Sequence, residues 1–207
     1  MAGGYEFTVD WFSGAIPVWK QIIDRYRPAR VLEVGSYEGR SACFAIEQCA
    51  AGWPIELHCV DTWEGGVEHK GVVQMSDVER RFDSNIALAM SEAAHPVQFH
   101  KHKALSHDAL ARLMAEGQGG GFDVIYIDGS HQAPDVLSDA VLAFHLLKVD
   151  GVLIFDDYLW ARGDYGQRDH YDMPKPAIDA FVNIYYRKVA VFSGPPLGQL
   201  YLRKVAP

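Results

Sequence analysis

The sequence is poor in cysteine, has no long apolar run and carries no excess of positive charge. Its three cysteines, Cys43, Cys49 and Cys59, lie in apolar segments without zinc-finger spacing. We therefore expect buried thiols in a reducing compartment. No apolar stretch reaches the length of a membrane span, and the first residues lack the basic start and apolar core of a signal peptide. These absences predict a cytoplasmic protein that does not bind membranes.

The charge balance is acidic, with a formal net charge of −8. This argues against sequence-independent binding to nucleic acid, because the phosphate backbone selects for lysine and arginine. Apolar residues make up 49% of the 207 residues, enough to fill one sizeable core. No repeat or long linker divides the chain. We expect a single domain over 1–207, with an N-terminal helical segment at 1–28.

Strand-like and helix-like segments alternate along the chain. Strands are predicted over 30–34, 55–60, 97–100, 122–127 and, after an Asp150-Gly151 turn, 152–155. Helices are predicted over 13–26 and 41–51, and two more are predicted to begin at Pro134 and at Pro176. The segments 187–192 and 198–203 are predicted to form a closing hairpin. This order predicts an α/β fold, a Rossmann-like three-layer sandwich with a mainly parallel seven-stranded sheet and a C-terminal antiparallel hairpin. In such sheets ligands bind at the carboxyl ends of the strands.

A glycine-bearing loop follows the first predicted strand, with the sequence Glu33-Val34-Gly35-Ser36-Tyr37-Glu38-Gly39. Gly35 allows a sharp turn, and Gly39 allows a close approach to a ligand. The loop lacks the G-x-G-x-x-G pattern that holds a pyrophosphate at a helix N-terminus. The acidic residue at the strand end suits a ligand with positive charge, such as an amino acid ammonium group. The alternative is a tight turn with a solvated glutamate.

The E-x-G-x-x-x-G arrangement resembles the first motif of class I S-adenosylmethionine-dependent methyltransferases, whose loop surrounds the methionine part of the cofactor. The resemblance implies that this cofactor contacts Glu33, Gly35, Ser36 and Gly39, and also Asp128 at a neighbouring strand end. The Lys103-Ala104-Leu105-Ser106 segment is similar to the K-G-x-S segment of related enzymes, which reaches the adenine. Ala104 departs from the usual glycine of that segment.

Asp61 ends the second predicted strand, where an acidic side chain can accept hydrogen bonds from both ribose hydroxyls. A helix cap or turn former is the alternative. The adjoining Trp63 could flank the adenine or could belong to the core.

Three further carboxylates are predicted at one edge of the sheet. Asp128 follows the strand over 122–127, and Asp156 and Asp157 follow the strand over 152–155. Carboxylates packed together raise one another's pKa unless a cation binds among them. Oxygen ligands suit a hard divalent ion, Mg²⁺ first. Alternatively, these aspartates cap helices or lie exposed.

The run I-D-G-S-H, followed by a glycine turn and F-D-D-Y, resembles the metal-dependent O-methyltransferase branch that includes the macrocin-type sugar methyltransferases. The resemblance covers about residues 5–190. It implies that Asp128, Asp156 and Asp157 bind the metal, and that His131 is the general base. An imidazole can accept a hydroxyl proton at neutral pH, and a divalent ion lowers the pKa of that hydroxyl. A hydrogen-bonded turn residue is the alternative for His131.

The remaining histidines carry little signal. His95, His100, His102 and His107 are close in sequence, but mixed strand and loop spacing should scatter them over a solvated face. The aromatic-rich loop over 158–173 is expected to form a lid over the substrate.

We therefore expect an S-adenosylmethionine-dependent, Mg²⁺-assisted O-methyltransferase with a small-molecule acceptor, such as a sugar or a natural-product conjugate. A homodimer is the default oligomeric state. One alternative is a metal-independent N- or O-methyltransferase. Others are a nicotinamide-dependent oxidoreductase, which the missing G-x-G-x-x-G pattern disfavours, and a non-catalytic cofactor-binding or scaffold protein.

Overall fold

The computed structural model describes residues 4–66, 73–163 and 168–207 of the chain. The strands are β1 (Arg30–Val34), β2 (Ile55–Asp61), β3 (Val97–Lys103), β4 (Phe122–Ile127), β5 (Leu147–Phe155), β6 (Val189–Val191) and β7 (Leu200–Lys204). The helices are α1 (Ile16–Tyr26), α2 (Arg40–Cys49), α3 (Met75–Glu92), α4 (Ser106–Ala115), α5 (Ala133–Leu146) and α6 (Pro174–Ile184), with short 3-10 turns η1 (Ser13–Ala15) and η2 (His170–Asp172).

The strands form one seven-stranded sheet in the order β3-β2-β1-β4-β5-β7-β6. The first five strands in this order are parallel to one another, and β7 pairs antiparallel with both β5 and β6. Every residue of β4 is buried, as expected of a strand covered on both faces. The predicted Rossmann-like sheet with a C-terminal antiparallel hairpin is confirmed.

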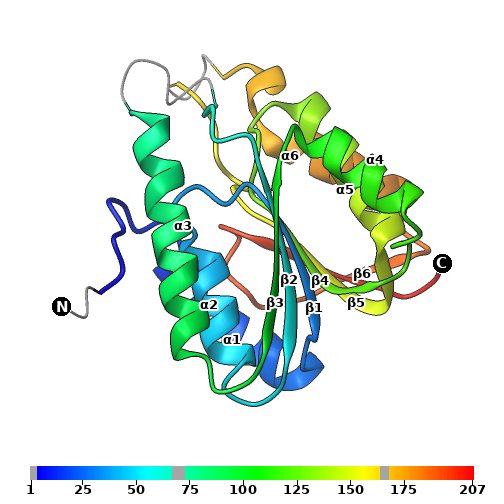
Figure 1. Ribbon diagram of the computed structural model, residues 1–207. Helices are drawn as coiled ribbons and strands as arrows, with labels where there is room; N and C mark the ends of the chain where they lie inside the picture. The colour runs from blue at the N-terminus through cyan, green and yellow to red at the C-terminus, as the bar shows by residue number, and fades with distance from the viewer. Residues whose placement is uncertain (1–3, 67–72, 164–167) are drawn as a thin grey trace.

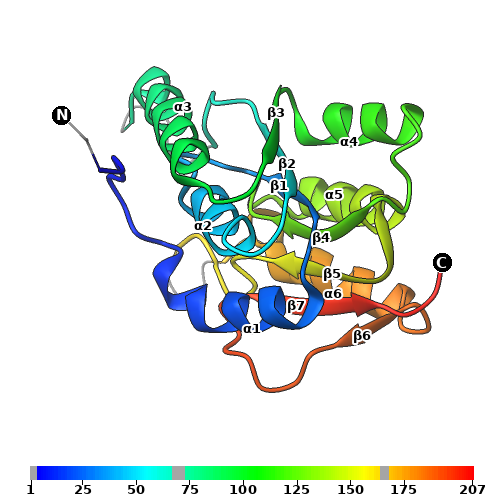
Figure 2. The same ribbon diagram turned by 60° about the horizontal axis from the view of Figure 1, so that its bottom comes forward.

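Helices cover both faces of the sheet (Figure 1). The helices α1, α2 and α3 pack on one face, and α4, α5 and α6 on the other, an arrangement also visible in the turned view of Figure 2. Each face has its own apolar core, and the two cores include Trp19 and Phe82 on one side and Phe144 and Phe181 on the other. The strand order reverses at β1, because β2 lies on one side of it and β4 on the other. In α/β sheets a crevice forms at such a switch point.

Two helices were not predicted from the sequence. Helix α3 is rich in charged residues, yet its Val78, Phe82, Ile86 and Ala89 keep helical spacing and are buried. Helix α4 buries Ala109, Leu110 and Leu113 in the same way. Strand β3 also continues to Lys103 instead of ending at residue 100, because an edge strand accommodates alternating charged and polar side chains.

The predicted turn at Asp150-Gly151 is wrong. Strand β5 begins at Leu147, and the irregularity lies inside it, where the register with β4 shifts between Phe122 and Val124. Asp150 has a φ of 67°, which marks a bulge. Helix α6 begins at Pro174, two residues before the predicted start at Pro176.

The three cysteines are free and buried, as predicted. In the part of the chain that the structure describes, no helix has the length and apolar character needed to cross a membrane.

Candidate functional site

The glycine loop after β1 lies directly against the end of β4. The backbone N–H of Asp128 donates to the carbonyl of Val34 over 2.7 Å, and the N–H of Gly35 donates to Val60 over 2.8 Å. Gly35 has a φ of +82°, and a Cβ atom built on it would lie 1.9 Å from the carbonyl oxygen of Asp128. Only glycine fits this position. The fold therefore joins the predicted cofactor loop and the predicted acidic cluster into one site.

The Glu33 side chain is 2% exposed, so the alternative of a solvated glutamate is wrong. Its carboxylate accepts hydrogen bonds from the hydroxyl of Ser36, over 2.6 Å, and from the hydroxyl of Ser41. Burial raises the pKa of Glu33, partly offset by these hydroxyl donors. The carboxylate thus ties both ends of the loop to the end of β1. Its predicted contact with the cofactor stays a prediction.

Asp61, at the end of β2, also holds the loop. Its carboxylate accepts from the backbone N–H groups of Ser36, over 2.9 Å, and Tyr37, over 3.0 Å, and from that of Trp63 over 2.7 Å. Gly39 then precedes α2 with a φ of +81°, and a Cβ atom there would lie 3.0 Å from the Phe82 ring. The loop conformation is therefore fixed from several directions before any ligand binds.

The two predicted adenine contacts, Trp63 and Ser106, lie in different environments. Trp63 is 3% exposed, its ring packs at a tilt against Phe82 with the centroids 4.7 Å apart, and the ammonium of Lys101 lies 4.4 Å from its ring centroid. It is part of the core in this structure, which was the alternative interpretation. Ser106 is the first residue of α4 and hydrogen-bonds Asp139 on α5. Contact of either residue with adenine stays a prediction.

The three predicted carboxylates do gather at the ends of β4 and β5. The Tyr126 hydroxyl lies between two of them, 2.9 Å from Asp128 Oδ2 and close to Asp156 Oδ2. The backbone N–H of Asp157 donates to Asp156 Oδ1 over 2.7 Å. Asp157 adopts a φ of +54°, an uncommon conformation for a non-glycine residue and one often found at functional sites.

The cluster concentrates negative charge at partly buried positions. Burial and the neighbouring carboxylates of Asp156 and Asp157 raise the pKa of Asp128 well above its usual range. Burial also raises the pKa of Asp156, partly offset by the Tyr126 hydroxyl. A bound cation would relieve this repulsion.

His131 completes the cluster from the segment between β4 and α5. Its Nε2 atom lies 2.8 Å from Asp157 Oδ2, and its ring lies 4.1 Å from the ring of Trp160. One ligand atom each from Asp128, His131 and Asp157 falls within a span of 4.8 Å. This set of oxygen and nitrogen donors fits a divalent ion. It includes two of the predicted ligands and His131, which was predicted only as the base.

The third predicted ligand, Asp156, is directed toward a buried hydrogen-bond chain. Gln199 Nε2 donates to Asp156 Oδ2 over 2.9 Å, and the indole N–H of Trp19 donates to Gln199 Oε1 over 3.0 Å. Sequence reasoning missed Tyr126, Gln199 and Trp19 as parts of the site. Tyr126 had a signal, because it precedes Asp128 by two residues and so shares its strand face. No sequence pattern indicated Gln199, because it belongs to the C-terminal hairpin, which is distant in sequence from Asp156.

A small pocket opens beside the cluster. It is lined by Ile127, Asp128, Gly129, Ser130, His131, Val136, Phe155, Asp156, Asp157 and Pro174. Trp160, from the predicted lid at 158–173, covers one side of His131, and the Tyr158 hydroxyl donates to Asp179 over 2.7 Å. Residues 164–167 of that loop lie outside the described residues, and the lid stays a prediction.

Comparison with known proteins assigns the family. A family model described as a methyltransferase domain matches residues 32–158, which is more than half of the chain and includes the glycine loop, Asp61 and the cluster of carboxylates with His131. The chain belongs to this family and is a methyltransferase of the class I fold. No curated protein matches it.

Solved structures share the fold at low identity. The O-methyltransferase TomG of Streptomyces achromogenes, involved in tomaymycin synthesis and solved in complex with SAM, is 20% identical, with a TM-score of 0.64, and the match covers 96% of this chain and 82% of that one. An O-methyltransferase of Bacillus cereus, solved in complex with SAH, is 18% identical, with a TM-score of 0.61 and coverage of 95% and 82%.

Proposed function

We propose that this methyltransferase transfers the methyl group of S-adenosylmethionine to a hydroxyl of a small molecule, with the help of a divalent ion, Mg²⁺ first. The observation that carries the proposal is the contact between Gly35 and Asp128. This contact sets the cofactor loop against a cluster of carboxylates. A methyl donor and an anionic metal-binding group would then share one pocket.

The donor side of the site uses groups that are already fixed. Glu33 and Asp61 hold the Gly35–Gly39 loop, and a preorganised loop binds a ligand without a further ordering cost. The SAM and SAH complexes of the two similar structures support the choice of donor. Asp61 has one carboxylate oxygen on the loop amides and the other on the Trp63 N–H. To accept a hydrogen bond from a ribose hydroxyl, the Asp61 carboxylate would have to give up one of these bonds.

On the acceptor side, Asp128 and Asp157 would hold the ion. When bound, the ion lowers the pKa of an acceptor hydroxyl and orients it. His131 lies next to Asp157 and takes the proton from that hydroxyl, since imidazole accepts protons near neutral pH. Tyr126 and Gln199 keep Asp156 in place behind the cluster. Trp160 and Pro174 would exclude water from one side of the pocket.

The main rival is a metal-independent N- or O-methyltransferase in which the aspartates only order the loop. A non-catalytic cofactor-binding protein is the rival of another class. Under either rival, any effect of Mg²⁺ on the Tm should be the same with and without the Asp157 carboxylate.

The first experiment is calorimetric titration with S-adenosylhomocysteine, in Mg²⁺ and then in excess chelator. We expect binding in both conditions, and absence of binding in both would overturn the proposed donor. The second is thermal unfolding with and without Mg²⁺, for the wild type, for Asp157→Asn and for the control Asp135→Asn on the exposed first turn of α5. A Mg²⁺-induced rise in Tm that is lost only in Asp157→Asn supports the metal site. An equal response in all three proteins would favour the metal-independent rival.

A further inference from the structure

A second cluster of potential metal ligands lies on the same sheet, away from the methyltransferase site. Glu56 and His58 alternate along β2, and His100 and His102 alternate along β3. Side chains at alternate positions share one face of a strand. The register pairs His58 with His100 and Val60 with His102, so the histidines lie side by side. The prediction that His100 and His102 scatter over a solvated surface is therefore wrong, because β3 extends through both.

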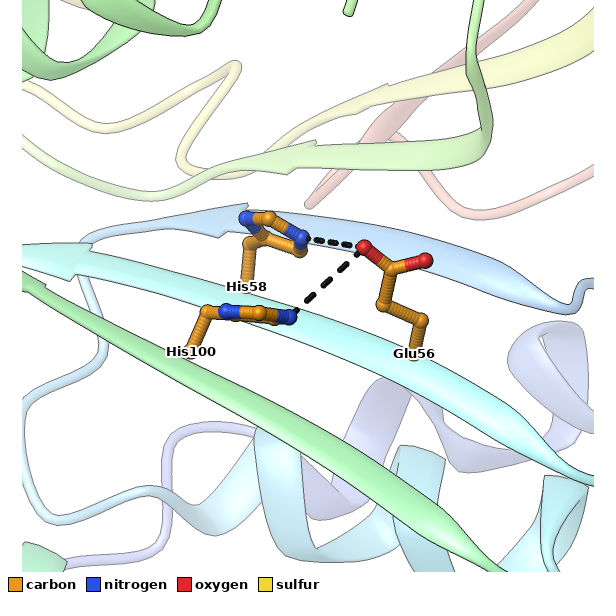
Figure 3. A group of neighbouring side chains, drawn as sticks. All are labelled: Glu56, His58 and His100. Atoms are coloured by element: carbon orange, nitrogen blue, oxygen red, sulfur yellow. Dashed lines mark hydrogen bonds and ion pairs between the residues drawn. The ribbon is translucent and has the colours of Figure 1, made fainter.

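Three side chains of this cluster converge on one point (Figure 3). Glu56 Oε1 lies 2.8 Å from His58 Nε2 and 3.7 Å from His100 Nε2. All three ligand atoms fall within 4.8 Å of one another. Figure 3 shows the two imidazoles rising from neighbouring strands toward the same carboxylate oxygen. Nothing in methyl transfer as described above uses these residues.

These separations match the size of a zinc coordination sphere. Zn²⁺ binds imidazole nitrogen and carboxylate oxygen at about 2.0–2.2 Å with tetrahedral angles, which sets its ligand atoms roughly 3.3 Å apart. The two separations to Glu56 Oε1, 2.8 and 3.7 Å, lie on either side of that value. Two imidazoles and one carboxylate are also a donor set that favours zinc and its neighbours over magnesium.

Hydrogen bonds from surrounding residues would hold the ligands in place. His102 Nε2 lies 2.9 Å from His58 Nδ1, so that it can fix the His58 tautomer. The Gln98 amide lies 3.0 Å from His100 Nε2, which is the proposed ligand atom itself, so this amide would have to turn away when the ion binds. Arg30 Nε donates to Glu56 Oε2 over 2.8 Å, whereas its Nη2 is 3.2 Å from Oε1. Oε1 therefore has the longer of the two bonds from Arg30, and it is the oxygen that faces both imidazoles.

The cluster is sheltered but reachable. The side chain of His58 is 5% exposed, that of Glu56 24% and that of His100 36%. A partly buried site discourages full hydration of a bound ion, while the His100 side leaves a way in and room for a water ligand. Other charged groups near the cluster are Arg30 beside Glu56, and Arg112 in the last turn of α4 and Glu116 just after it, both beside His102.

We propose that Glu56, His58 and His100 form a binding site for Zn²⁺ or a similar borderline divalent ion, with a water as fourth ligand. The ion would link the edge strand β3 to β2 and so raise the stability of the folded protein. Glu56 lies near the start of β2, whereas Asp61 of the cofactor loop site is at its end. The proposal does not depend on the proposed function.

The test is calorimetric titration of chelator-treated protein with Zn²⁺ in the presence of excess Mg²⁺. All proteins carry Asp157→Asn, which weakens Zn²⁺ binding at the cluster of Asp128 and Asp157. The titration then reports mainly on the second cluster. The reference protein is compared with His100→Asn and Glu56→Gln, two changes at partly exposed positions that keep size and polarity. The control is His95→Asn, an exposed histidine outside the cluster. Circular dichroism checks that each variant is folded without metal.

We expect one Zn²⁺ to bind the reference and the His95→Asn protein, and to raise their Tm. His100→Asn and Glu56→Gln should each weaken this binding by more than about tenfold and lose the rise in Tm. Replacing Zn²⁺ by Co²⁺ should give the intense visible absorption of a tetrahedral ion, and only in the two proteins that bind. If His100→Asn and Glu56→Gln titrate like the reference, or if no protein binds Zn²⁺, the site is not there.

Discussion

Gly35 and Asp128 approach so closely that no side chain can be placed between them, since a Cβ on Gly35 would meet the Asp128 carbonyl oxygen at 1.9 Å. Two backbones are in contact, so neither can yield as a flexible side chain would. The contact joins the loop after β1 to the end of β4, and the site depends on this junction.

Gly35→Ala should therefore destabilise the protein and weaken S-adenosylhomocysteine binding. The added methyl clashes with backbone, and the φ of +82° is strained for alanine, which together cost about 2–4 kcal/mol of unfolding free energy. Urea unfolding measures the first effect and calorimetry the second. Gly14→Ala is the control, because a Cβ there meets nothing within 4 Å. Equal stability of the two variants would contradict the junction.

Tyr126→Phe should lower stability, since the hydroxyl that lies between Asp128 and Asp156 is lost. The two partly buried carboxylates would then face each other without this donor, at a cost of about 1–3 kcal/mol. Mg²⁺ binding should also weaken about tenfold, because the carboxylates lose their orientation. Urea unfolding and Mg²⁺ titration test both effects. The surface change Tyr186→Phe should alter stability by less than about 0.5 kcal/mol.

Asp128→Asn should have the opposite effect on stability. Removing one charge from three neighbouring carboxylates relieves their repulsion, and the metal-free protein should gain about 1–2 kcal/mol. The same change should abolish the Mg²⁺-induced rise in Tm. Thermal unfolding in chelator and in Mg²⁺ measures both. The exposed Asp108→Asn serves as the control, and a loss of stability in Asp128→Asn without metal would count against the repulsion.

Asp139 predicts a pH dependence of stability. Burial, partly offset by the Ser106 hydroxyl, raises the pKa of Asp139 from 3.8 to about 7. The folded state therefore holds a proton that the unfolded state releases, and stability falls as the pH rises from about 4 to 7, by at most roughly 4 kcal/mol. Asp139→Asn should not show this part of the decline and should be more stable than the wild type at pH 8.

Chemical unfolding at several pH values, for the wild type and Asp139→Asn, isolates this contribution from that of other acids. A constant difference between the two proteins from pH 4 to 8 would show that Asp139 ionises in the folded state as it does in the unfolded one.

The sequence predicts the parts of the fold where one strong local signal dominates. Strand β4 has apolar residues on nearly every position because it is covered on both faces, and Pro134 marks the start of α5. Helix α3 was not predicted because charged residues are interspersed among the apolar ones of its first half, although Val78, Phe82 and Ile86 keep helical spacing. The bulge at Asp150 was not predicted, because an Asp-Gly pair is more often found in a turn. The longer strand becomes evident only from the pairing of β5 with β4.

For the site, sequence reasoning identified the residues that follow strand ends, since parallel topology brings such positions together. It therefore predicted that Asp128, Asp156 and Asp157 gather at one edge of the sheet, whereas the role of His131 came from the family resemblance. It could not give the direction of each side chain. That Asp156 is directed toward Gln199, and that Trp63 is buried against Phe82, depend on packing between distant segments.

The sheet ends in two very different strands, β3 and β6. Strand β6 has only three residues, which is too short to template another chain. On β3, Lys101 and Lys103 pair with Glu79 of α3, and the opposite face carries the histidines. Neither edge strand is both long and uncharged, as strands that form fibrils are. This enzyme should therefore remain free of edge-to-edge aggregation at high concentration.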